Sequence, residues 1–149
     1  MPQPQVRTTS GTYEGLWADD AHSVQVFKGI AYAAPPVGPL RFKPPVPKPS
    51  VAGVTLAQTD PTPGWQAHSE DAFVWSRGVF PRTEDCLYLN VWAPKGATAV
   101  DGELPVMVWF HGGAHTSGWG HHPLFDGGYF ASQGVILVTV NYRLGPWGF

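Results

Sequence analysis

The chain has 149 residues, of which 43% are hydrophobic, so its length predicts one domain or part of one with enough apolar side chains for a core. Only 13% of the residues are charged and the formal net charge is −2, which argues against nucleic acid or an anionic membrane surface as a partner. No apolar run approaches the roughly 18 residues of a membrane span, and the start MPQPQVRTTSG lacks the apolar stretch of a signal peptide.

The first half of the chain predicts strands followed by long connections. Residues 12–17 and 23–32 are rich in β-branched and aromatic side chains and flank the polar turn ADDAH, a pattern typical of an antiparallel hairpin. Residues 33–50 are interrupted by prolines and predict a loop that packs on the body of the protein. Residues 57–85 show no hydrophobic period and predict a long surface connection.

The second half predicts alternating strands and one short helix. Residues 86–94 predict a strand that begins at Cys86, a small thiol expected to be buried. Residues 106–110 form an unbroken apolar run that predicts a buried strand, and residues 135–142 predict another that is apolar on both faces. Between these two, residues 126–134 predict a short helix with Asp126 at its start and Gly134 at its end. A strand, a helix and a strand in this order indicate a right-handed crossover and a parallel pair, and so a mixed α/β sheet.

The segment His111-Gly112-Gly113-Ala114 directly follows one of these strands and suggests binding of negative charge. Glycine lets the backbone adopt positive φ and lets another group approach closely, and successive N–H groups at such a turn can converge on an anion. A phosphate cradle is one interpretation, but neither GxxxxGK[ST] nor GxGxxG is present. An oxyanion hole is the second interpretation, and a tight turn without any ligand is the third.

Four blocks of the sequence occur in the order found in one enzyme family. They are VFKGIAYAAPPVGPLRFKPP, EDCLYLNVWAP, PVMVWFHGGAHTSG and GVILVTVNYRLGPWGF. Together they resemble the N-terminal portion of the type-B carboxylesterases, which include para-nitrobenzyl-type esterases and cholinesterases. The resemblance implies that residues 1–149 are the N-terminal part of a single α/β-hydrolase domain, truncated before the nucleophile elbow. This incomplete α/β-hydrolase fold would have antiparallel strands at its start that lead into a mixed, mostly parallel sheet.

The resemblance also assigns roles to individual residues. The backbone N–H groups of Gly113 and Ala114 would be the oxyanion donors, Gly112 would shape the loop, and His111 would support it through a hydrogen bond. His115 stands where a phenylalanine or tyrosine is usual. Arg41 and Glu84 match an ion pair that ties the proline-rich loop to the core.

The implied activity is that of a serine hydrolase that cleaves small-molecule carboxylic esters through an acyl-enzyme, without a cofactor. No serine of the chain stands in G-x-S-x-G, so the nucleophile, the catalytic acid and the catalytic histidine are not among these residues. The chain alone is therefore expected to be inactive. A non-catalytic, cholinesterase-like binding module and an inactive truncated fragment are the alternatives, and a nucleotide-binding α/β domain is a weaker one.

Two further expectations concern metals and location. His111 and His115 are four residues apart, but glycines and no glutamate separate them, so we expect no metal site. Cys86 is the only cysteine, and the bridge that it makes in many secreted relatives therefore has no partner. This favours a cytoplasmic location, or a secreted one if a leader precedes the sequence. The oligomeric state is not predicted.

Overall fold

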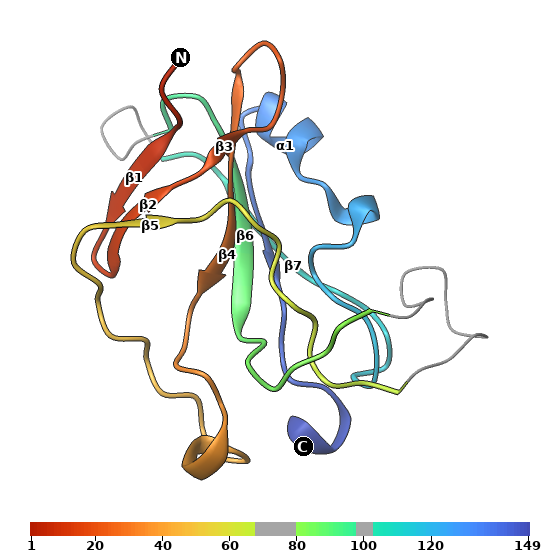
Figure 1. The fold of residues 1–149 in the computed structure, drawn as a ribbon. Helices are drawn as coiled ribbons and strands as arrows, with labels where there is room; N and C mark the ends of the chain where they lie inside the picture. The colour runs from red at the N-terminus through yellow and green to blue at the C-terminus, as the bar shows by residue number, and fades with distance from the viewer. Residues whose placement is uncertain (68–79, 98–102) are drawn as a thin grey trace.

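The computed structural model describes residues 1–67, 80–97 and 103–149, and its strands form two sheets (Figure 1). The smaller sheet has the order β1-β2-β5, with strands β1 (Gln5–Thr8), β2 (Gly11–Glu14) and β5 (Val54–Leu56). The larger sheet has the order β3-β4-β6-β8-β7, with strands β3 (Leu16–Trp17), β4 (Val24–Ala31), β6 (Tyr88–Pro94), β7 (Val106–Phe110) and β8 (Ile136–Val140). The helical elements are short: α1 (Gly128–Ser132) and the 3₁₀ turns η1 (Gly38–Leu40), η3 (Pro123–Phe125) and η4 (Gly145–Trp147).

The larger sheet is mixed, but within the described residues it is not mostly parallel, and that part of the prediction is wrong. The pairs β3–β4, β4–β6 and β6–β8 are antiparallel, and only β7–β8 is parallel. The crossover that contains α1 returns the chain to the starting end of β7, which makes this one pair parallel as expected. Among the described residues, the larger sheet contains one such crossover, and its other three pairs are antiparallel.

The predicted hairpin at the start of the chain divides between the two sheets. β3 pairs with β4 as expected, whereas β2 pairs with β1 and β5, two strands that the sequence did not predict. Gly15 lies between β2 and β3, where a Cβ atom would stand 2.3 Å from the carbonyl oxygen of Val26. The chain can therefore pass from one sheet to the other at this point only because residue 15 has no side chain.

Each face of the larger sheet is covered at its β4–β6 end. On one face Val24, Val26 and Trp92 form a buried cluster with Ala131 of α1. On the other face Phe27 packs against Tyr13 of the smaller sheet and Ala57. The alternation of side chains along β4 thus serves two layers, with α1 on one side and the smaller sheet on the other (Figure 1).

Strand β7 is exposed, contrary to the prediction of a buried strand. All five of its side chains are at least 41% exposed, and Phe110 reaches 65%. The reason is the strand order, because β7 is at the edge of the sheet, beyond the cover that α1 and the smaller sheet provide. The last strand of the chain, β8, is not at the edge, since it lies between β6 and β7.

Helix α1 is shorter than predicted, and its N-cap is Gly127 and not Asp126, whereas Gly134 follows its end as expected. Asp126 lies two residues before it and accepts a hydrogen bond from the N–H of Gly128 at 2.8 Å. Gly134 follows with φ of +84°, the left-handed conformation that commonly ends a helix. The glycines that weaken its first turn explain why only five residues are helical.

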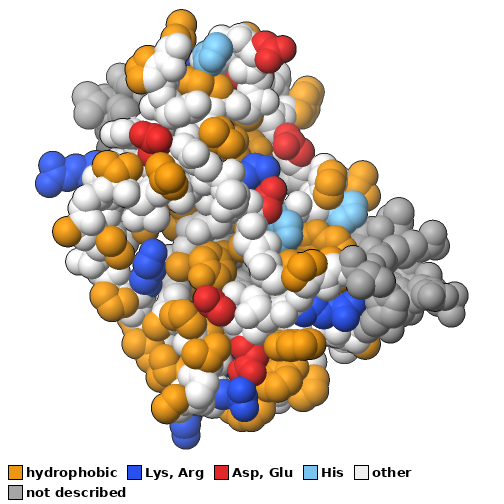
Figure 2. All heavy atoms as spheres, viewed as in Figure 1, with side chains coloured by type: hydrophobic (Ala, Val, Ile, Leu, Met, Phe, Trp, Pro, Cys, Tyr) orange, Lys and Arg blue, Asp and Glu red, His pale blue; other side chains and the backbone are white. Residues whose placement is uncertain are grey.

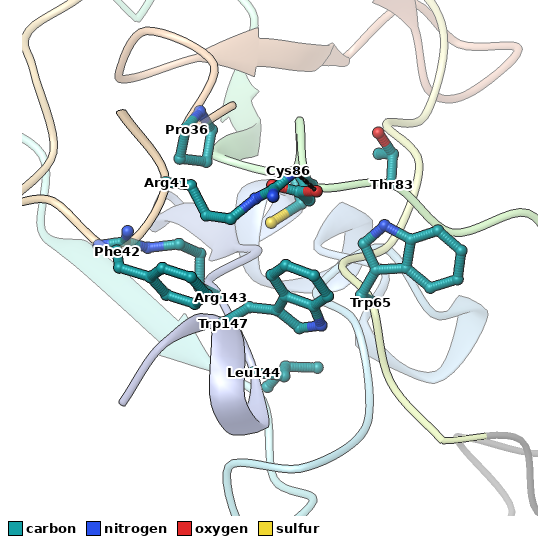
Figure 3. A pocket seen from close by; sticks show the side chains of 10 residues that line it. Pro36, Arg41, Phe42, Trp65, Thr83, Cys86, Arg143, Leu144 and Trp147 are labelled. Atoms are coloured by element: carbon teal, nitrogen blue, oxygen red, sulfur yellow. Dashed lines mark hydrogen bonds and ion pairs between the residues drawn. The ribbon is translucent and has the colours of Figure 1, made fainter. Parts of the chain in front are cut away.

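The proline-rich loop is held to the body of the protein by the predicted ion pair. Arg41 donates from Nε and Nη2 to the two carboxylate oxygens of Glu84 at 2.7 and 2.6 Å. Phe42 stacks on Trp147 at 5.8 Å, and Arg41 lies over the same indole ring. Figure 3 shows Arg41, Phe42 and Trp147 on the side of Cys86 to which its sulfur points. Cys86 is 2% exposed, as predicted for a buried thiol. Contacts to residues distant in sequence therefore fix this loop.

The surface carries charges of both signs. Figure 2 shows acidic and basic side chains interspersed on the face drawn there, with hydrophobic side chains gathered in its lower part. The predicted surface connection at residues 57–85 lies partly outside the described residues. In its described parts, Ala57, the residue that follows β5, belongs to the core. Asp60 forms an ion pair with Lys28 at 2.8 Å.

Candidate oxyanion-binding loop

The loop after β7 has an unusual backbone conformation. It follows the carboxyl end of a strand in a parallel pair, where α/β proteins place ligand sites. Three consecutive residues have positive φ: Gly113 at +124°, Ala114 at +52° and His115 at +59°. Alanine and histidine rarely adopt this region, which costs on the order of 1–3 kcal/mol per residue, and such strain is concentrated at functional sites. The conformation of this loop therefore marks it as a candidate site.

The peptide group between Gly112 and Gly113 is held at its carbonyl end. His111 Nδ1 lies 2.8 Å from the carbonyl oxygen of Gly112. Because the peptide unit is planar and trans, fixing this oxygen also fixes the direction of the Gly113 N–H at the opposite end of the same unit. The contact thus orients the first predicted donor.

The next peptide group is held in the same way by four donors. The carbonyl oxygen of Gly113 accepts from the backbone N–H groups of Thr116 at 2.9 Å and Ser117 at 3.1 Å. The hydroxyl groups of the same two residues donate to it at 3.0 and 3.4 Å. This concentration of donors on one oxygen fixes the plane whose other end is the Ala114 N–H.

The N–H groups themselves stay available. Throughout the described ranges, the backbone amides of Gly112, Gly113, Ala114 and His115 donate no hydrogen bond to another protein group. The carbonyl ends of two successive peptide units are therefore occupied while their N–H ends are free. Hydrogen bonds at a carbonyl polarise the unit and make its N–H a stronger donor. Such an arrangement can hold a negatively charged oxygen.

His111 is positioned by Tyr142. The imidazole is 3% exposed and stacks on the phenol ring with a centroid separation of 4.3 Å and an interplanar angle of 12°. Tyr142 Oη donates to the His111 carbonyl oxygen at 2.5 Å. Burial lowers the pKa of His111, which favours the neutral imidazole. A carbonyl can only accept, so Nδ1 carries the proton and Nε2 does not.

The two glycines of the loop differ in what they require. A Cβ atom at Gly113 would lie 1.9 Å from the carbonyl oxygen of Ser117, so no other residue fits without moving the loop. A Cβ atom at Gly112 would meet nothing within 4 Å. The loop shape thus depends on Gly113, whereas the open space beside Gly112 would let another molecule approach the backbone. The role of Gly112 in shaping the loop stays a prediction.

The remaining histidines that the structure describes do not gather into a metal site. His115 lies against Phe149, with ring centroids 5.3 Å apart, and His121 faces Asn141. Within residues 1–67, 80–97 and 103–149 no three His, Cys, Asp or Glu side chains could share a metal ion. In the same part of the chain no helix has the length and apolar character needed to cross a membrane.

Sequence reasoning missed two residues that hold the loop in place. Tyr142 follows β8, and Gln66 lies in the connection before the first residues that the structure leaves undescribed. Both act through contacts between segments far apart in the chain, so no local pattern signals them. Asn141 Oδ1 accepts a hydrogen bond from the Gly120 N–H at 2.7 Å and so holds the segment beyond the loop.

Comparison with known proteins places the loop in a family. The family model described as "Carboxylesterase family" matches residues 2–149. The chain belongs to the carboxylesterase family. Its sequence is 46% identical to the para-nitrobenzyl esterase of Bacillus subtilis strain 168, covering 100% of this chain and 29% of that protein. It is 40% identical to acetylcholinesterase-1 of Trittame loki, covering 98% of this chain and 27% of the relative.

Solved structures of the family share the fold. A PNB esterase structure superposes with a TM-score of 0.84 at 44% identity, covering 99% of this chain and 29% of that one. The carboxylesterase of Geobacillus stearothermophilus superposes with a TM-score of 0.81 at 38% identity, covering 97% and 27%. The carboxylesterase-family chain described here therefore spans less than a third of the length of these relatives.

Proposed function

We propose that this chain supplies the oxyanion-binding loop of a serine hydrolase that cleaves small-molecule carboxylic esters. The observation that carries the proposal is the pair of free amides at Gly113 and Ala114, on peptide units whose carbonyl oxygens are held by other groups. Membership of the carboxylesterase family supports the choice of an ester over other substrates that develop negative charge.

In the proposed reaction a serine hydroxyl attacks the ester carbonyl and forms a tetrahedral intermediate. The carbonyl oxygen gains a negative charge, and the N–H groups of Gly113 and Ala114 donate to it. Collapse of the intermediate expels the alcohol and leaves an acyl-enzyme, which water then hydrolyses. A donor that is fixed before the reaction needs no reorganisation, and losing one costs roughly 3–4 kcal/mol in the barrier.

The neutral state of His111 suits this role. A charged imidazolium beside the loop would bind the anion of a product acid as well as the oxyanion, whereas a neutral ring acts only by orienting the Gly112–Gly113 peptide. Because burial lowers the pKa of His111 below the usual value of an exposed histidine, the neutral ring predominates at neutral pH.

The rest of the machinery lies outside these residues in our proposal. None of the seven serines stands in G-x-S-x-G, so the nucleophile, its histidine and the acid come from other parts of the parent protein. A third oxyanion donor would come from the residue after the nucleophile. We expect the 149-residue chain to have no esterase activity when it is isolated.

The test compares two glycine substitutions in the full-length parent protein. Gly113→Ala places a methyl group 1.9 Å from the Ser117 oxygen and should lower kcat for p-nitrophenyl butyrate by about 100-fold or more, because the donors move. Gly134→Ala is the control, since residue 134 has φ of +84° and open space around it. It precedes the start of β8, the end of that strand that lies away from the loop. An equal loss in both variants, or hydrolysis unaffected by Gly113→Ala, would contradict the proposal.

A further inference from the structure

The side-chain amide of Gln66 forms two hydrogen bonds with the backbone of Gly118, at the far end of the loop. Oε1 accepts from the Gly118 N–H at 2.8 Å, and Nε2 donates to the Gly118 carbonyl oxygen at 3.1 Å. Nε2 also donates to the Gly64 carbonyl oxygen at 3.2 Å. The amide orientation is fixed by its partners, because an N–H can only donate and a carbonyl oxygen can only accept. The two bonds to Gly118 connect Gln66 to the loop, 52 positions away in the sequence, and the third bond lies within residues 64–66.

Gly118 in turn lies directly against the contact that orients the first oxyanion donor. Its φ is +105°, and a Cβ atom there would stand 2.6 Å from His111 Nδ1 and 2.7 Å from the Gly112 carbonyl oxygen. These are the two atoms of the hydrogen bond that fixes the Gly112–Gly113 peptide. A shift at Gly118 would therefore be transmitted to that hydrogen bond, because the space between them would not hold even a methyl group.

We infer that Gln66 is a positioning residue for ester hydrolysis, acting through Gly118 and His111 on the N–H of Gly113. This inference rests on the proposed function. Gln66 touches neither the free amides nor the space in front of them, so it would not bind substrate. Its effect would be confined to how well the Gly113 N–H points at the oxyanion, which matters in the transition state and little in the ground state.

Gln58 provides a matched control. It belongs to the same connection, is half-buried, and also uses its side-chain amide to hold the backbone: Nε2 donates to the Gly15 carbonyl oxygen and to Glu14 Oε1, both at 3.2 Å. Those partners belong to the β2–β3 junction and not to the loop. Gln58→Met therefore removes a comparable clamp at a distance from the site.

The experiment measures steady-state hydrolysis of p-nitrophenyl butyrate by the full-length parent, with active sites counted from the acylation burst. Gln66→Met should lower kcat per active site by about tenfold and leave KM within about twofold, since one donor is misdirected but not removed. Gln58→Met should lower the melting temperature but leave kcat per active site within about twofold. Gln66→Glu, which loses both donated bonds at unchanged size, is the second variant in case the first does not fold.

The possible results separate the two proposals. A tenfold loss of kcat that is specific to the Gln66 variants supports the inference. If Gly113→Ala abolishes hydrolysis while the Gln66 variants change only the melting temperature, the inference is wrong and the proposed function stands. If the wild-type parent does not hydrolyse esters, the proposed function fails, and the inference fails with it.

Discussion

Position 64 shows how closely single residues are fitted around the base of the loop. A Cβ atom at Gly64 would lie 3.6 Å from Cys86 Cβ and 3.2 Å from its sulfur. Burial raises the pKa of Cys86 to about 11, so this thiol is protonated at neutral pH in the folded chain. The cysteine of this family block thus faces a glycine where a second cysteine could be bridged, since disulfides have Cβ–Cβ separations of about 3.5–4.5 Å.

We therefore predict that Gly64→Cys forms a disulfide with Cys86 under oxidising conditions. The bridge should raise the free energy of unfolding by about 3 kcal/mol, because it closes a loop of roughly 20 residues in the unfolded chain. Thiol titration in denaturant should find no free thiol before reduction and two after it. Gly64→Ser is the size-matched control and should gain nothing. Two free thiols in the oxidised variant would contradict the geometry at this position.

At the scale of elements, β7 is the one strand of the described residues in which every residue is exposed. Val106, Val108 and Phe110 are 58%, 48% and 65% exposed on one face, and the other face is also open. In the part of the chain that the structure describes, the strand has a hydrogen-bonded neighbour on one side only. An apolar edge strand of this kind favours association with other chains.

The isolated 149-residue chain should therefore self-associate, and Val108→Lys should reduce this. A lysine on the exposed edge should interrupt the apolar surface. It should lower the free energy of unfolding by less than about 1 kcal/mol, because the valine is not in the core. Val54→Lys is the control, as Val54 is 52% exposed on β5 at the edge of the other sheet. Analytical ultracentrifugation over a concentration series measures the effect. An unchanged association constant for Val108→Lys would show that β7 is not the surface involved.

The sequence predicted the positions of the strands better than it predicted which of them are buried. The strands at β4, β6, β7 and β8 and the crossover between the last two were identified from apolar patterns and turn residues. β1 and β5 were missed, because four and three residues with mostly exposed side chains carry no periodic signal. β7 was expected to be buried because its residues form an apolar run. Its exposure depends instead on its place in the strand order, which decides what packs against it.

The site was predictable only in its local part. His111, Gly113 and Ala114 follow one another, so the pattern and the family resemblance pointed to them directly. Gln66 and Tyr142 hold the same loop from positions distant in the sequence, and an isolated glutamine or tyrosine has no distinguishing pattern. Which glycine is sterically required also depends on the path of the loop back to Ser117, which no spacing rule contains.

At the scale of the whole molecule, burial of histidines should make stability depend on pH. Burial lowers the pKa of His111, His121 and His122 relative to the exposed side chain. The unfolded chain therefore binds more protons than the folded one at mildly acidic pH, and stability is fully present above about pH 6.5 and lost as the pH falls through the folded values.

The free energy of unfolding by urea, monitored by tryptophan fluorescence, should therefore fall with a measurable slope between about pH 7.5 and pH 5. His111→Asn should reduce the slope, since its amide can still donate to the Gly112 carbonyl oxygen but does not titrate in this range. A slope of zero in the wild type, or an unchanged slope in His111→Asn, would rule out His111 as a contributor.

The most direct test of the account is a crystal structure of the full-length parent with its nucleophile trapped by a trifluoromethyl ketone, whose adduct carries an oxyanion. We predict that the oxyanion lies about 2.7–3.1 Å from the backbone nitrogens of both Gly113 and Ala114, with the peptide carbonyls of Gly112 and Gly113 still bonded to His111 Nδ1 and to Thr116 and Ser117. An oxyanion that points to solvent or to other donors, with these two amides unoccupied, would contradict the assignment of the loop.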